Sequence, residues 1–563
     1  MLPQKQYAVQ LVGPNNLIVN TSKDVFRPGP YQVLCMVEAV GLCFSDLKLL
    51  KQFSSHVRKG PVLSGIDSRI LDEIPSYVPG DKPTVPGHEA VVRIEAVGTK
   101  VKRCNPGQRF LVQTDYRWLR TAGANAAFGY NFEGALQQYV LMDERIITTP
   151  DGESMLVPVS EDLSAAAVAM VEPWACVENG YATVERRSLS TTGRTLFVAE
   201  RQPDVSMLSH FLNRFGRPAR ISWLSRFPPP QGLSEGIKIV SGISQTDDAT
   251  FDDIVYFGSN AQTAEELFAK LVPAGLFNIV LCGGRFTRDV LTMVGKIHYE
   301  GIRIIGSVGF DPAASMACIP HTGEIRPGDR VHVVGAAGPM GMMHVIRALC
   351  LGLGDITVFA DDIDKDRLAR LSDVAVPLAQ KNKLRYVTSD NSRPDIPGKI
   401  DYTVVMVPIP DLVAGAVGSA APGGIIHIFA GIPAAVSVRI DLNSYIEKKL
   451  YFVGTSGSVL DDMKRVLAKL QSAALDTNIS VAAVCGLESV PKAIHAVENR
   501  SIAGKIVAYP SCRGLGLLTL EELAETLPQV AQHLADNRWN KKAEDMLLAA
   551  FDKPTKYGRM ASD

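Results

Sequence analysis

The stretch that decides the fold is DRVHVVGAAGPMGMMHVIRALCLG, residues 329–352. It passes from an apolar run of strand type through Gly335, Gly338 and Gly341 directly into an apolar segment of helical type. Glycines in such a turn allow a tight bend and a close approach of the backbone to a bound molecule, toward which the helix points its N-terminus. The spacing is G-x-x-G-x-x-G instead of G-x-G-x-x-G, so the flanking strand and helix carry the prediction of a dinucleotide-binding turn.

A second apolar run, ITVFADD (residues 356–362), ends in two acids about twenty residues after the last glycine. An acid in this place accepts hydrogen bonds from the adenosine ribose, and Asp362 suits the role better than Asp361. A carboxylate there repels a 2′-phosphate, so NAD is favoured over NADP. The residues predicted to bind NAD are Gly335, Gly338, Pro339, Met340, Gly341 and Asp362.

The preceding segment, residues 185–310, repeats the order of patterns found in the nucleotide-binding half. FDDIVYFGSN (251–260) matches IDYTVVMVPIP (400–410), and GRTLFVAERQPDVSM (193–207) matches GDRVHVVGAAGPMGM (328–342). We therefore predict a second, degenerate copy with a Rossmann-like fold.

The degenerate copy lacks the features that a dinucleotide needs. Its counterparts of the three glycines are Ala199, Gln202 and Val205, whose side chains block a close backbone approach. Glu200 and Asp204 would direct negative charge at a bound pyrophosphate. We expect this copy to bind no dinucleotide.

The N-terminal third is predicted to be rich in β-strands, because YQVLCMVEAVGLC (31–43) and EAVVRIEAVG (89–98) are β-branched and partly alternating. Cys43 ends the first run, His88 precedes the second, and Glu172 precedes an apolar helical segment. A thiolate, an imidazole and a carboxylate suit a tetrahedral zinc with one position open to water or substrate. The alternatives are a buried apolar role for Cys43, a turn histidine at His88 and a helix N-terminal acid at Glu172.

Six motifs follow one another along the chain: GLCFSDLKLL (41–50), VPGHEAVVRIEAVGTKVKRCNPGQRF (85–110), EGALQQYV (133–140), VEPWACVENG (171–180), VVGAAGPMG (333–341) and IAGKIVAYP (502–510). Together they resemble the medium-chain, zinc-dependent alcohol dehydrogenase family, in particular its sorbitol and threonine dehydrogenase branch. The resemblance covers most of residues 1–181 and 321–510. With the repeated segment, the expected fold class is α/β: a GroES-like, β-rich catalytic domain plus two tandem Rossmann-type, doubly wound domains.

The resemblance implies roles for residues around Cys43. The implied metal ligands are Cys43, His88, Glu89 and Glu172, and the implied catalytic residues are Ser45, Asp46 and Glu89. Asp46 would orient His88 from behind, and Ser45 matches the family's proton-relay hydroxyl. Glu89 is either a transient ligand or a base behind the ligands, so the persistent third ligand is Glu89 or Glu172.

The implied reaction is reversible hydride transfer between NAD and a secondary alcohol, a polyol or a sugar-like molecule. A phosphorylated sugar stays open, because Lys51, Arg58, Lys59 and Arg117 lie on segments expected near the site. Two other functions also stay open: a zinc-free quinone or enoyl reductase of the same superfamily, and a non-enzymatic, NAD-responsive scaffold. The complete set of predicted zinc ligands favours the dehydrogenase.

Two segments depart from the family pattern. Residues 51–82 form a longer connection between the cysteine and histidine motifs, and either shape or cover the substrate pocket or form a solvated loop. Residues 117–134 contain no cysteine where the family has a structural zinc lobe, so one zinc per chain and no structural site are expected. The aromatic residues there, Trp118, Phe128, Tyr130 and Phe132, would pack that lobe or line the substrate site.

Composition argues against several other classes of function. Lys and Arg total 58 against 59 Asp and Glu, so no attraction to nucleic acid or to an acidic membrane is expected. The uncharged stretch 412–438 contains Pro422 and Pro433 and is predicted to form buried strands and turns, not a membrane span. Nine cysteines without a CxxC pair, and an N-terminus without an apolar signal, indicate a reducing, cytoplasmic location.

We predict five segments along the chain: a GroES-like catalytic domain (1–184), a degenerate Rossmann-like domain (185–320), an NAD-binding Rossmann domain (321–457), a return to the catalytic domain (458–510) and a C-terminal helical extension (511–563). Because an exposed sheet edge pairs readily with another edge, the chain is expected to form a homodimer or an internal pseudo-dimer. In the pseudo-dimer, the degenerate copy takes the place of a partner subunit's nucleotide domain.

Overall fold

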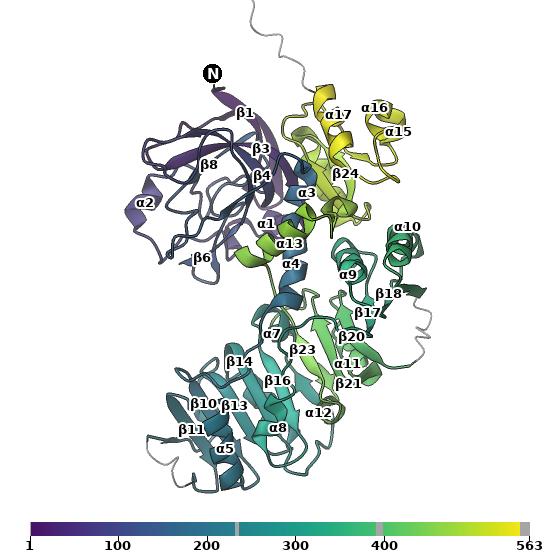
Figure 1. Cartoon of the computed structure of the whole chain (residues 1–563). Coiled ribbons are helices and arrows are strands. Elements are labelled where there is room, and N and C mark those ends of the chain that lie inside the picture. The colour runs from purple at the N-terminus through teal and green to yellow at the C-terminus, as the bar shows by residue number, and fades with distance from the viewer. Residues whose placement is uncertain (1, 231–235, 390–397, 552–563) are drawn as a thin grey trace, which may run out of the picture. The chain divides into compact units, whose positions relative to one another are not determined.

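The computed structural model describes residues 2–230, 236–389 and 398–551 (Figure 1). The chain forms two compact units: Met1–Ala175 together with Ser458–Asp563, and Cys176–Gly457. The last part of the predicted helical extension, residues 552–563, lies outside the described residues.

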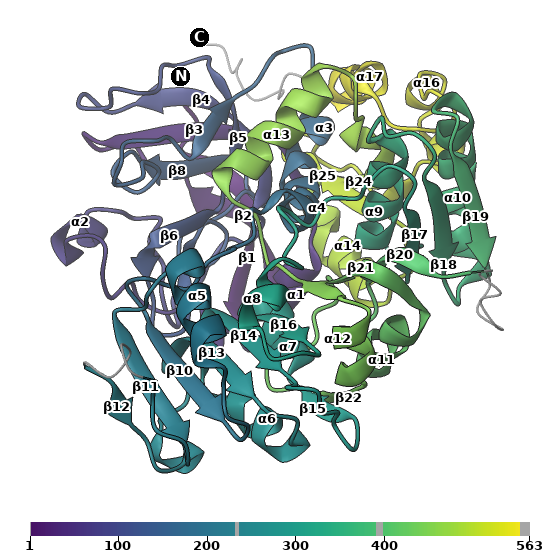
Figure 2. The same cartoon turned by 60° about the horizontal axis from the view of Figure 1, so that its bottom comes forward.

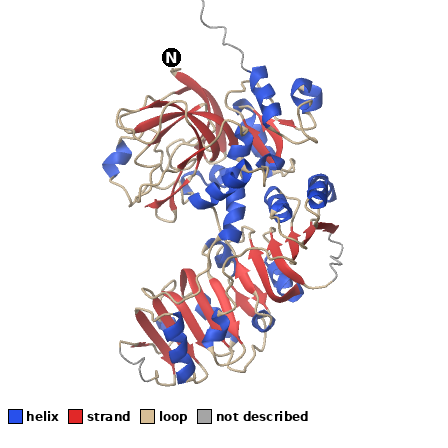
Figure 3. Ribbon diagram, in the orientation of Figure 1, coloured by secondary structure: helices blue, strands red, loops and turns tan. Residues whose placement is uncertain are grey.

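An eight-stranded sheet forms the centre of the first unit. Its main path is β26 (Leu518–Thr519), β24 (Val481–Cys485), β25 (Lys505–Ala508), β3 (Gln32–Gly41), β4 (Glu89–Val97), β5 (Arg109–Val112) and β9 (Leu156–Pro158), and β8 (Tyr139–Asp143) pairs with β3. β25 pairs antiparallel with the end of β3, so the chain returns from residue 458 onward to complete this sheet. Figure 3 shows that strands dominate this N-terminal part, as the alternating sequence pattern predicts.

The second unit contains two six-stranded parallel sheets of the same strand order. One has the order β12 (Lys238–Ile239), β11 (Arg220–Ser225), β10 (Arg194–Ala199), β13 (Phe251–Phe257), β14 (Leu271–Val280) and β16 (Arg303–Ser307). The other has β19 (Arg385–Ser389), β18 (Thr357–Asp361), β17 (Arg330–Val334), β20 (Ile400–Val405), β21 (Ala420–Ile428) and β23 (Tyr451–Val453). In each sheet the first strand of the segment lies centrally, which is the Rossmann order. The predicted α/β class with two Rossmann-type sheets is confirmed.

The two parallel sheets meet at equivalent edges, β16 of one and β23 of the other (Figure 1). The equivalent short strands β15 (Val290–Thr292) and β22 (Val438–Ile440) pair antiparallel with each other (Figure 2). Tyr445, in α12 (Leu442–Glu447), donates a hydrogen bond to the carbonyl of Ile304, at 2.8 Å. One hydrophobic core runs through both sheets, because Ile304 and Phe452 belong to the same buried cluster.

The secondary structure of the apolar stretch 412–438 agrees only in part with the predicted strands and turns. Its first part belongs to helix α11 (Pro410–Ser419), so the prediction of strands and turns is wrong there, and β21 follows as expected. Pro410 occupies the first helical position, where its fixed φ favours a helix start. Among the described residues, no helix is both long and apolar enough to span a membrane.

The C-terminal extension is anchored to the first unit by a buried acid. Glu544, in α17 (Lys541–Phe551), is 1% exposed. Its carboxylate accepts hydrogen bonds from the backbone N–H of Ala165 at 2.5 Å and of Ala166 at 2.8 Å, and from the hydroxyl of Tyr509 at 2.8 Å. Ala165 and Ala166 begin helix α3 (Ala165–Ala169), so the extension caps the first turn of that helix.

Removing this carboxylate should destabilise the first unit. We expect Glu544→Ala to lower the free energy of unfolding by about 3–5 kcal/mol, because three buried donors lose their acceptor. Urea unfolding followed by circular dichroism measures the change. Lys541→Ala, which removes an exposed ion pair with Asp545 on the same helix, should cost less than about 0.5 kcal/mol. Equal effects of the two substitutions would contradict the anchoring role.

Candidate active site

Asp46 connects the cysteine and histidine motifs. Cys43 is the N-cap of α1 (Phe44–Gln52), and Asp46 lies in the first turn of that helix. The carboxylate of Asp46 accepts hydrogen bonds from the backbone N–H of Cys43 at 3.0 Å and of Gly87 at 3.3 Å. The side chain is 4% exposed, so a buried anion holds the end of β3 beside the start of β4.

His88 lies between Asp46 and Ser45. Its Nδ1 is 3.3 Å from Oδ1 of Asp46, and its Nε2 is 3.1 Å from the hydroxyl oxygen of Ser45. Burial raises the pKa of Asp46, but the charge and hydrogen bond of His88, the N–H of Cys43 and the charge of Lys505 together lower it by more, so the carboxyl stays ionised. An anion behind an imidazole orients the ring and makes it a better donor to a metal.

Glu89 completes a buried cluster with Cys43 and His88. The thiol, the imidazole and the Glu89 carboxylate offer ligand atoms that all lie within 4.8 Å of one another. Oε1 of Glu89 accepts a hydrogen bond from Nζ of Lys505 at 2.5 Å, whereas its buried Oε2 has no hydrogen-bond partner. A Cβ at Gly41 would lie 2.1 Å from that Oε2, so only glycine leaves room for the carboxylate.

This donor set fits a zinc ion. Thiolate, imidazole and carboxylate are the three ligand types that zinc takes from proteins. A fully buried carboxylate oxygen without a hydrogen bond costs free energy, and a cation held by the same carboxylate would offset that cost. In the described part of the chain, this is the one group of three such side chains close enough to share an ion.

Glu172 is not a member of this group. It lies in the first turn of α4 (Val171–Ala182) and is 8% exposed. Burial lowers the pKa of Lys505, but the charges of Glu89 and Cys43 raise it by more. The charge of Glu172 adds a smaller increase to the same pKa. The structure therefore brings Cys43, His88 and Glu89 together and leaves Glu172 near Lys505.

Sequence reasoning missed Lys505 and named Tyr130 without assigning it to this cluster. Lys505 lies on β25 and neutralises Glu89 across 416 positions of sequence. Tyr130 packs against the imidazole of His88, with ring centroids 5.8 Å apart, although it was expected only as one of several aromatic residues. The Gly-Lys pair in IAGKIVAYP was the available signal for Lys505, since a lysine inside an apolar strand needs a buried partner.

The 51–82 connection folds onto the hairpin of β6 (Asp115–Arg120) and β7 (Asn125–Ala127). Leu63 N–H donates to the Arg120 carbonyl at 2.7 Å, and the Thr121 hydroxyl donates to the Val57 carbonyl at 2.9 Å. Tyr77 and Phe132 stack in a tilted arrangement, with centroids 5.0 Å apart. Contacts with this connection and packing of aromatic side chains therefore stabilise the lobe at residues 117–134, for which the sequence predicts no structural zinc.

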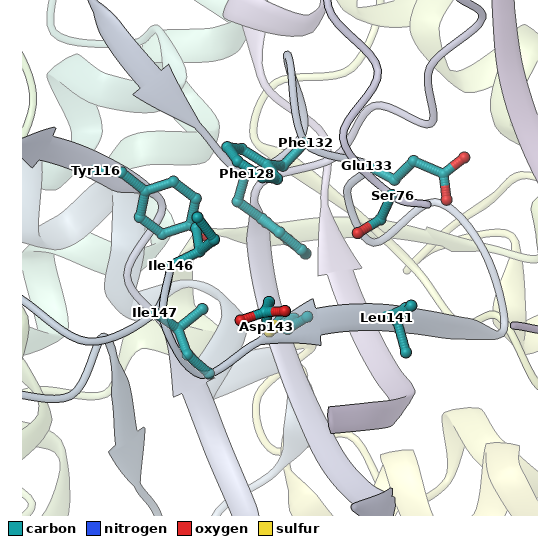
Figure 4. A pocket seen from close by; sticks show the side chains of 10 residues that line it. Ser76, Tyr116, Phe128, Phe132, Glu133, Leu141, Asp143, Ile146 and Ile147 are labelled. Carbon is teal, nitrogen blue, oxygen red and sulfur yellow. The ribbon is translucent and has the colours of Figure 1, made fainter. Parts of the chain in front are cut away.

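The same lobe borders a small cavity (Figure 4). Its lining includes Tyr116, Phe128, Phe132, Ser76, Glu133 and Asp143. The cavity has room for about one water molecule, so it is no substrate pocket. Of the predicted aromatic residues, Phe128 and Phe132 therefore pack the lobe, and Tyr130 packs against His88 of the candidate metal site.

The four basic residues expected near the site differ in their surroundings. Lys51 forms an exposed ion pair with Glu498 at 2.7 Å. Lys59 is fully buried and donates to the carbonyls of Val78 and Lys82, so its role is structural. Arg58 and Arg117 both contact the carboxylate of Asp115, at 3.2 and 3.3 Å.

In the second unit, the glycine turn links β17 to α9 (Pro339–Cys350). Gly335 has φ +81°, and a Cβ there would lie 2.5 Å from Val407. A Cβ at Gly341 would lie 2.2 Å from the carbonyl oxygen of Gly335, so the helix can approach the turn only with glycine there. Gly338 is the N-cap of α9 and makes no side-chain capping bond, and Pro339 and Met340 form the first helical positions.

The two acids at the end of β18 point to different places. Asp361 is 2% exposed, and its Oδ2 lies 3.5 Å from Nε2 of His332. Asp362 follows the strand and accepts a hydrogen bond from the backbone N–H of Ala337, in the glycine turn, at 2.9 Å. The carboxylate beside the turn is therefore that of Asp362.

The equivalent turn after β10 is closed by its own side chains. Asp204 caps α5 (Val205–Phe215), accepting from the N–H groups of Ser206 and Met207, both at 2.9 Å. Glu200 accepts hydrogen bonds from the hydroxyls of Tyr256 and Thr263, both at 2.7 Å. The carboxylate of Asp204 thus occupies the helix N-terminus that a pyrophosphate would need, and that of Glu200 is held nearby in the sequence by two hydroxyls.

Comparisons with known proteins agree with this arrangement. Residues 29–151 match the alcohol dehydrogenase GroES-like domain. The chain is 25% identical over 276 residues to L-sorbose 1-phosphate reductase of Klebsiella pneumoniae, covering 46% of this chain and 66% of that protein. It is 26% identical over 273 residues to mannitol-1-phosphate 5-dehydrogenase of Aliivibrio fischeri, covering 44% and 63%. The matches thus span less than two thirds of these curated relatives.

A solved structure shows the same fold. The 2R,3R-butanediol dehydrogenase of Bacillus subtilis superposes with a TM-score of 0.50 at 13% identity, covering 90% of this chain and 100% of that one. The GroES-like match and this fold agree with the resemblance that the ordered motifs carry. The chain is thus similar to medium-chain alcohol dehydrogenases in its GroES-like segment and in its fold.

Proposed function

We propose that this chain is a zinc-dependent oxidoreductase that transfers hydride between NAD and a secondary alcohol, a polyol or a sugar-like molecule. The observation that carries the proposal is the buried cluster of Cys43, His88 and Glu89, in which one carboxylate oxygen has no hydrogen bond. The named activities of the relatives, a sorbose-phosphate reductase and a mannitol-phosphate dehydrogenase, support oxidoreduction at a carbinol carbon.

In this proposal, Cys43, His88 and Glu89 hold the zinc, and Asp46 keeps the imidazole in place. When bound, zinc supplies a Lewis acid for the alcohol oxygen and the nicotinamide ring accepts the hydride. Ser45 is partly exposed and next to His88, so its hydroxyl can take a proton from the substrate hydroxyl and pass it to solvent. Lys505 balances the charge of Glu89.

NAD would lie against the second of the two parallel sheets, at the turn of Gly335, Gly338 and Gly341. The N-terminus of α9 has no capping side chain, so its N–H groups can bind a pyrophosphate. Asp362, beside the turn, would accept the ribose hydroxyls and disfavour a 2′-phosphate. We propose that the equivalent turn after β10, which carries Glu200 and Asp204, binds no dinucleotide.

We also propose that the domain boundaries follow the segments expected from the sequence and that the chain is an internal pseudo-dimer. Equivalent elements meet reciprocally: β15 pairs with β22, and β16 contacts β23. Reciprocal contact of equivalent surfaces is the mark of a two-fold interface. The degenerate copy would therefore cover the sheet edge that a partner subunit would otherwise cover.

Zinc content tests the metal site directly. We expect about one zinc per chain in freshly purified protein and a loss of most of it in Cys43→Ala, because a single cluster supplies the ligands. Cys318→Ala, a change at a partly exposed cysteine in the other unit, should retain the zinc. Elemental analysis by mass spectrometry measures it. Zinc-free wild-type protein would favour the zinc-free reductase instead.

Two glutamine substitutions distinguish the candidate third ligands. Glu89→Gln should weaken zinc binding by about 10- to 100-fold, because its carboxylate lies in the cluster, and Glu172→Gln should weaken it less. Competition with a chelator gives both affinities. A larger effect at Glu172 would assign the persistent ligand to that residue.

Cofactor choice depends on Asp362. Asp362→Ser should raise the ratio of kcat/KM with NADP to kcat/KM with NAD by about tenfold or more, since the change removes a charge that repels the 2′-phosphate. Steady-state kinetics with both cofactors measure the ratio. Asp366→Ser, at an exposed position in the next helix, should leave it unchanged, and an equal response would argue against the role of Asp362.

The pseudo-dimer predicts a monomer in solution. Because the β16 and β23 edges contact each other within one chain, sedimentation velocity should give the mass of a single chain over a wide concentration range. A dimer whose interface maps to β16 or β23 by hydrogen exchange would exclude the pseudo-dimer.

A further inference from the structure

The buried carboxylate of the C-terminal extension, that of Glu544, joins two elements of the first unit. It accepts hydrogen bonds from the backbone N–H groups of Ala165 and Ala166, at the start of α3, and from the hydroxyl of Tyr509, which directly follows β25. Trp539, also in the extension, donates its indole N–H to the Tyr509 oxygen at 2.9 Å. The extension therefore fixes the start of α3 and the end of β25 at one point.

The α3 helix leads from this point to one oxygen of Glu89. It packs against β3 and β4, the strand that Cys43 follows and the strand that Glu89 begins. Met170, the residue that ends α3, is fully buried and lies with Glu89 beside Gly41. A Cβ at Gly41 would lie 2.1 Å from Oε2 of Glu89 and 2.4 Å from Cε of Met170. The position of α3 thus limits the space around the carboxylate oxygen that has no hydrogen bond.

The β25 strand leads from the same point to the other oxygen of Glu89. Lys505 is the first residue of β25, and its Nζ donates to Oε1 of Glu89 at 2.5 Å. β25 also pairs with the end of β3, beside Gly41. A displacement of Tyr509 at the end of this short strand would therefore move the lysine that holds Glu89.

We propose that Glu544 is a positioning residue of the candidate active site. It acts through α3 on Met170 and through β25 on Lys505. These two side chains in turn keep the carboxylate of Glu89 where it can hold a metal ion together with Cys43 and His88. The inference rests on the proposed function. Groups that orient a metal ligand from behind decide metal affinity as well as stability, so the extension supports the site in addition to anchoring the first unit.

The zinc affinity of the full chain, measured by competition with a chelator, tests this inference. We expect Glu544→Ala to weaken zinc binding by about three- to tenfold, less than the loss of about 10- to 100-fold that follows removal of a ligand's direct partner. Glu544→Gln keeps one acceptor oxygen and should restore part of the affinity. In the cobalt-loaded protein, the visible absorption bands should change in Glu544→Ala, because they report the ligand geometry.

Leu141→Ala separates positioning from stability. Leu141 is buried in a small core that it forms with Val25 and Leu34, so the truncation opens a cavity and destabilises the first unit. That core contains no member of the metal-site cluster, and we expect this variant to bind zinc as the wild type does. Equal losses of zinc affinity in Leu141→Ala and Glu544→Ala would overturn the positioning role.

A double-mutant cycle tests the route through β25. Tyr509→Phe removes the hydroxyl that joins Glu544 to the end of the strand and should weaken zinc binding by about two- to threefold. In the Glu544→Ala background the same change should have no further effect, because the contact is already lost. Effects that add in the double variant would overturn this route.

The outcomes distinguish this inference from the proposed function. Wild-type zinc affinity in Glu544→Ala would overturn the positioning role and leave the proposed zinc site intact. Wild-type protein that binds no zinc would overturn both. Weakened zinc binding in Glu544→Ala, in a protein that turns over no alcohol, would support the positioning role and contradict the oxidoreductase.

Discussion

One buried carboxylate, that of Asp46, holds the candidate metal site together. It binds the backbone N–H groups of Cys43 and Gly87 and lies 3.3 Å from the imidazole of His88. The two motifs that it joins are separated in sequence by the 51–82 connection. The entropic cost of closing a loop grows only slowly with the length of the loop. Because Asp46 fixes both ends of this connection, a long connection costs little more than a short one. The connection is then free to supply new side chains, and it carries His56 and Arg58 to the edge of the site.

The second unit depends on a different constraint, the unpaired edge of a parallel sheet. Such an edge exposes backbone donors and acceptors and pairs readily with another chain. Here β16 and β23 approach each other within one chain, and Tyr445 and Ile304 link the two sheets by a hydrogen bond inside a shared core. Because both sheets belong to one chain, this contact costs no entropy of association between separate molecules. Its stability is therefore independent of protein concentration.

The sequence predictions that the structure confirms were made from local patterns. The strand, glycine turn and helix at 329–352 predict a Rossmann unit because all three lie within one short stretch. Contacts between distant segments were not predicted. Lys505 binds Glu89 across 416 positions of sequence, and the backbone of Gly41 lies close to the same carboxylate. No spacing rule reports such contacts, because they depend on how distant strands pair. The error at α11 has a local cause: a short apolar run fits a buried strand and a buried helix equally well.

The two Rossmann-type sheets share a strand order and differ at the turn that follows the central first strand. The strand order is the same in both sheets and one hydrophobic core runs through them, so the strand order does not depend on the glycine turn. The two turns differ in whether a side chain accepts hydrogen bonds from the first N–H groups of the following helix. No side chain caps α9, whereas Asp204 accepts from two N–H groups of α5. An uncapped N-terminus leaves donors that an anion can satisfy, and a capped one has already satisfied them. The carboxylate of Asp204 therefore supplies internally, at the N-terminus of α5, the hydrogen-bond acceptor that an anion could supply at the N-terminus of α9.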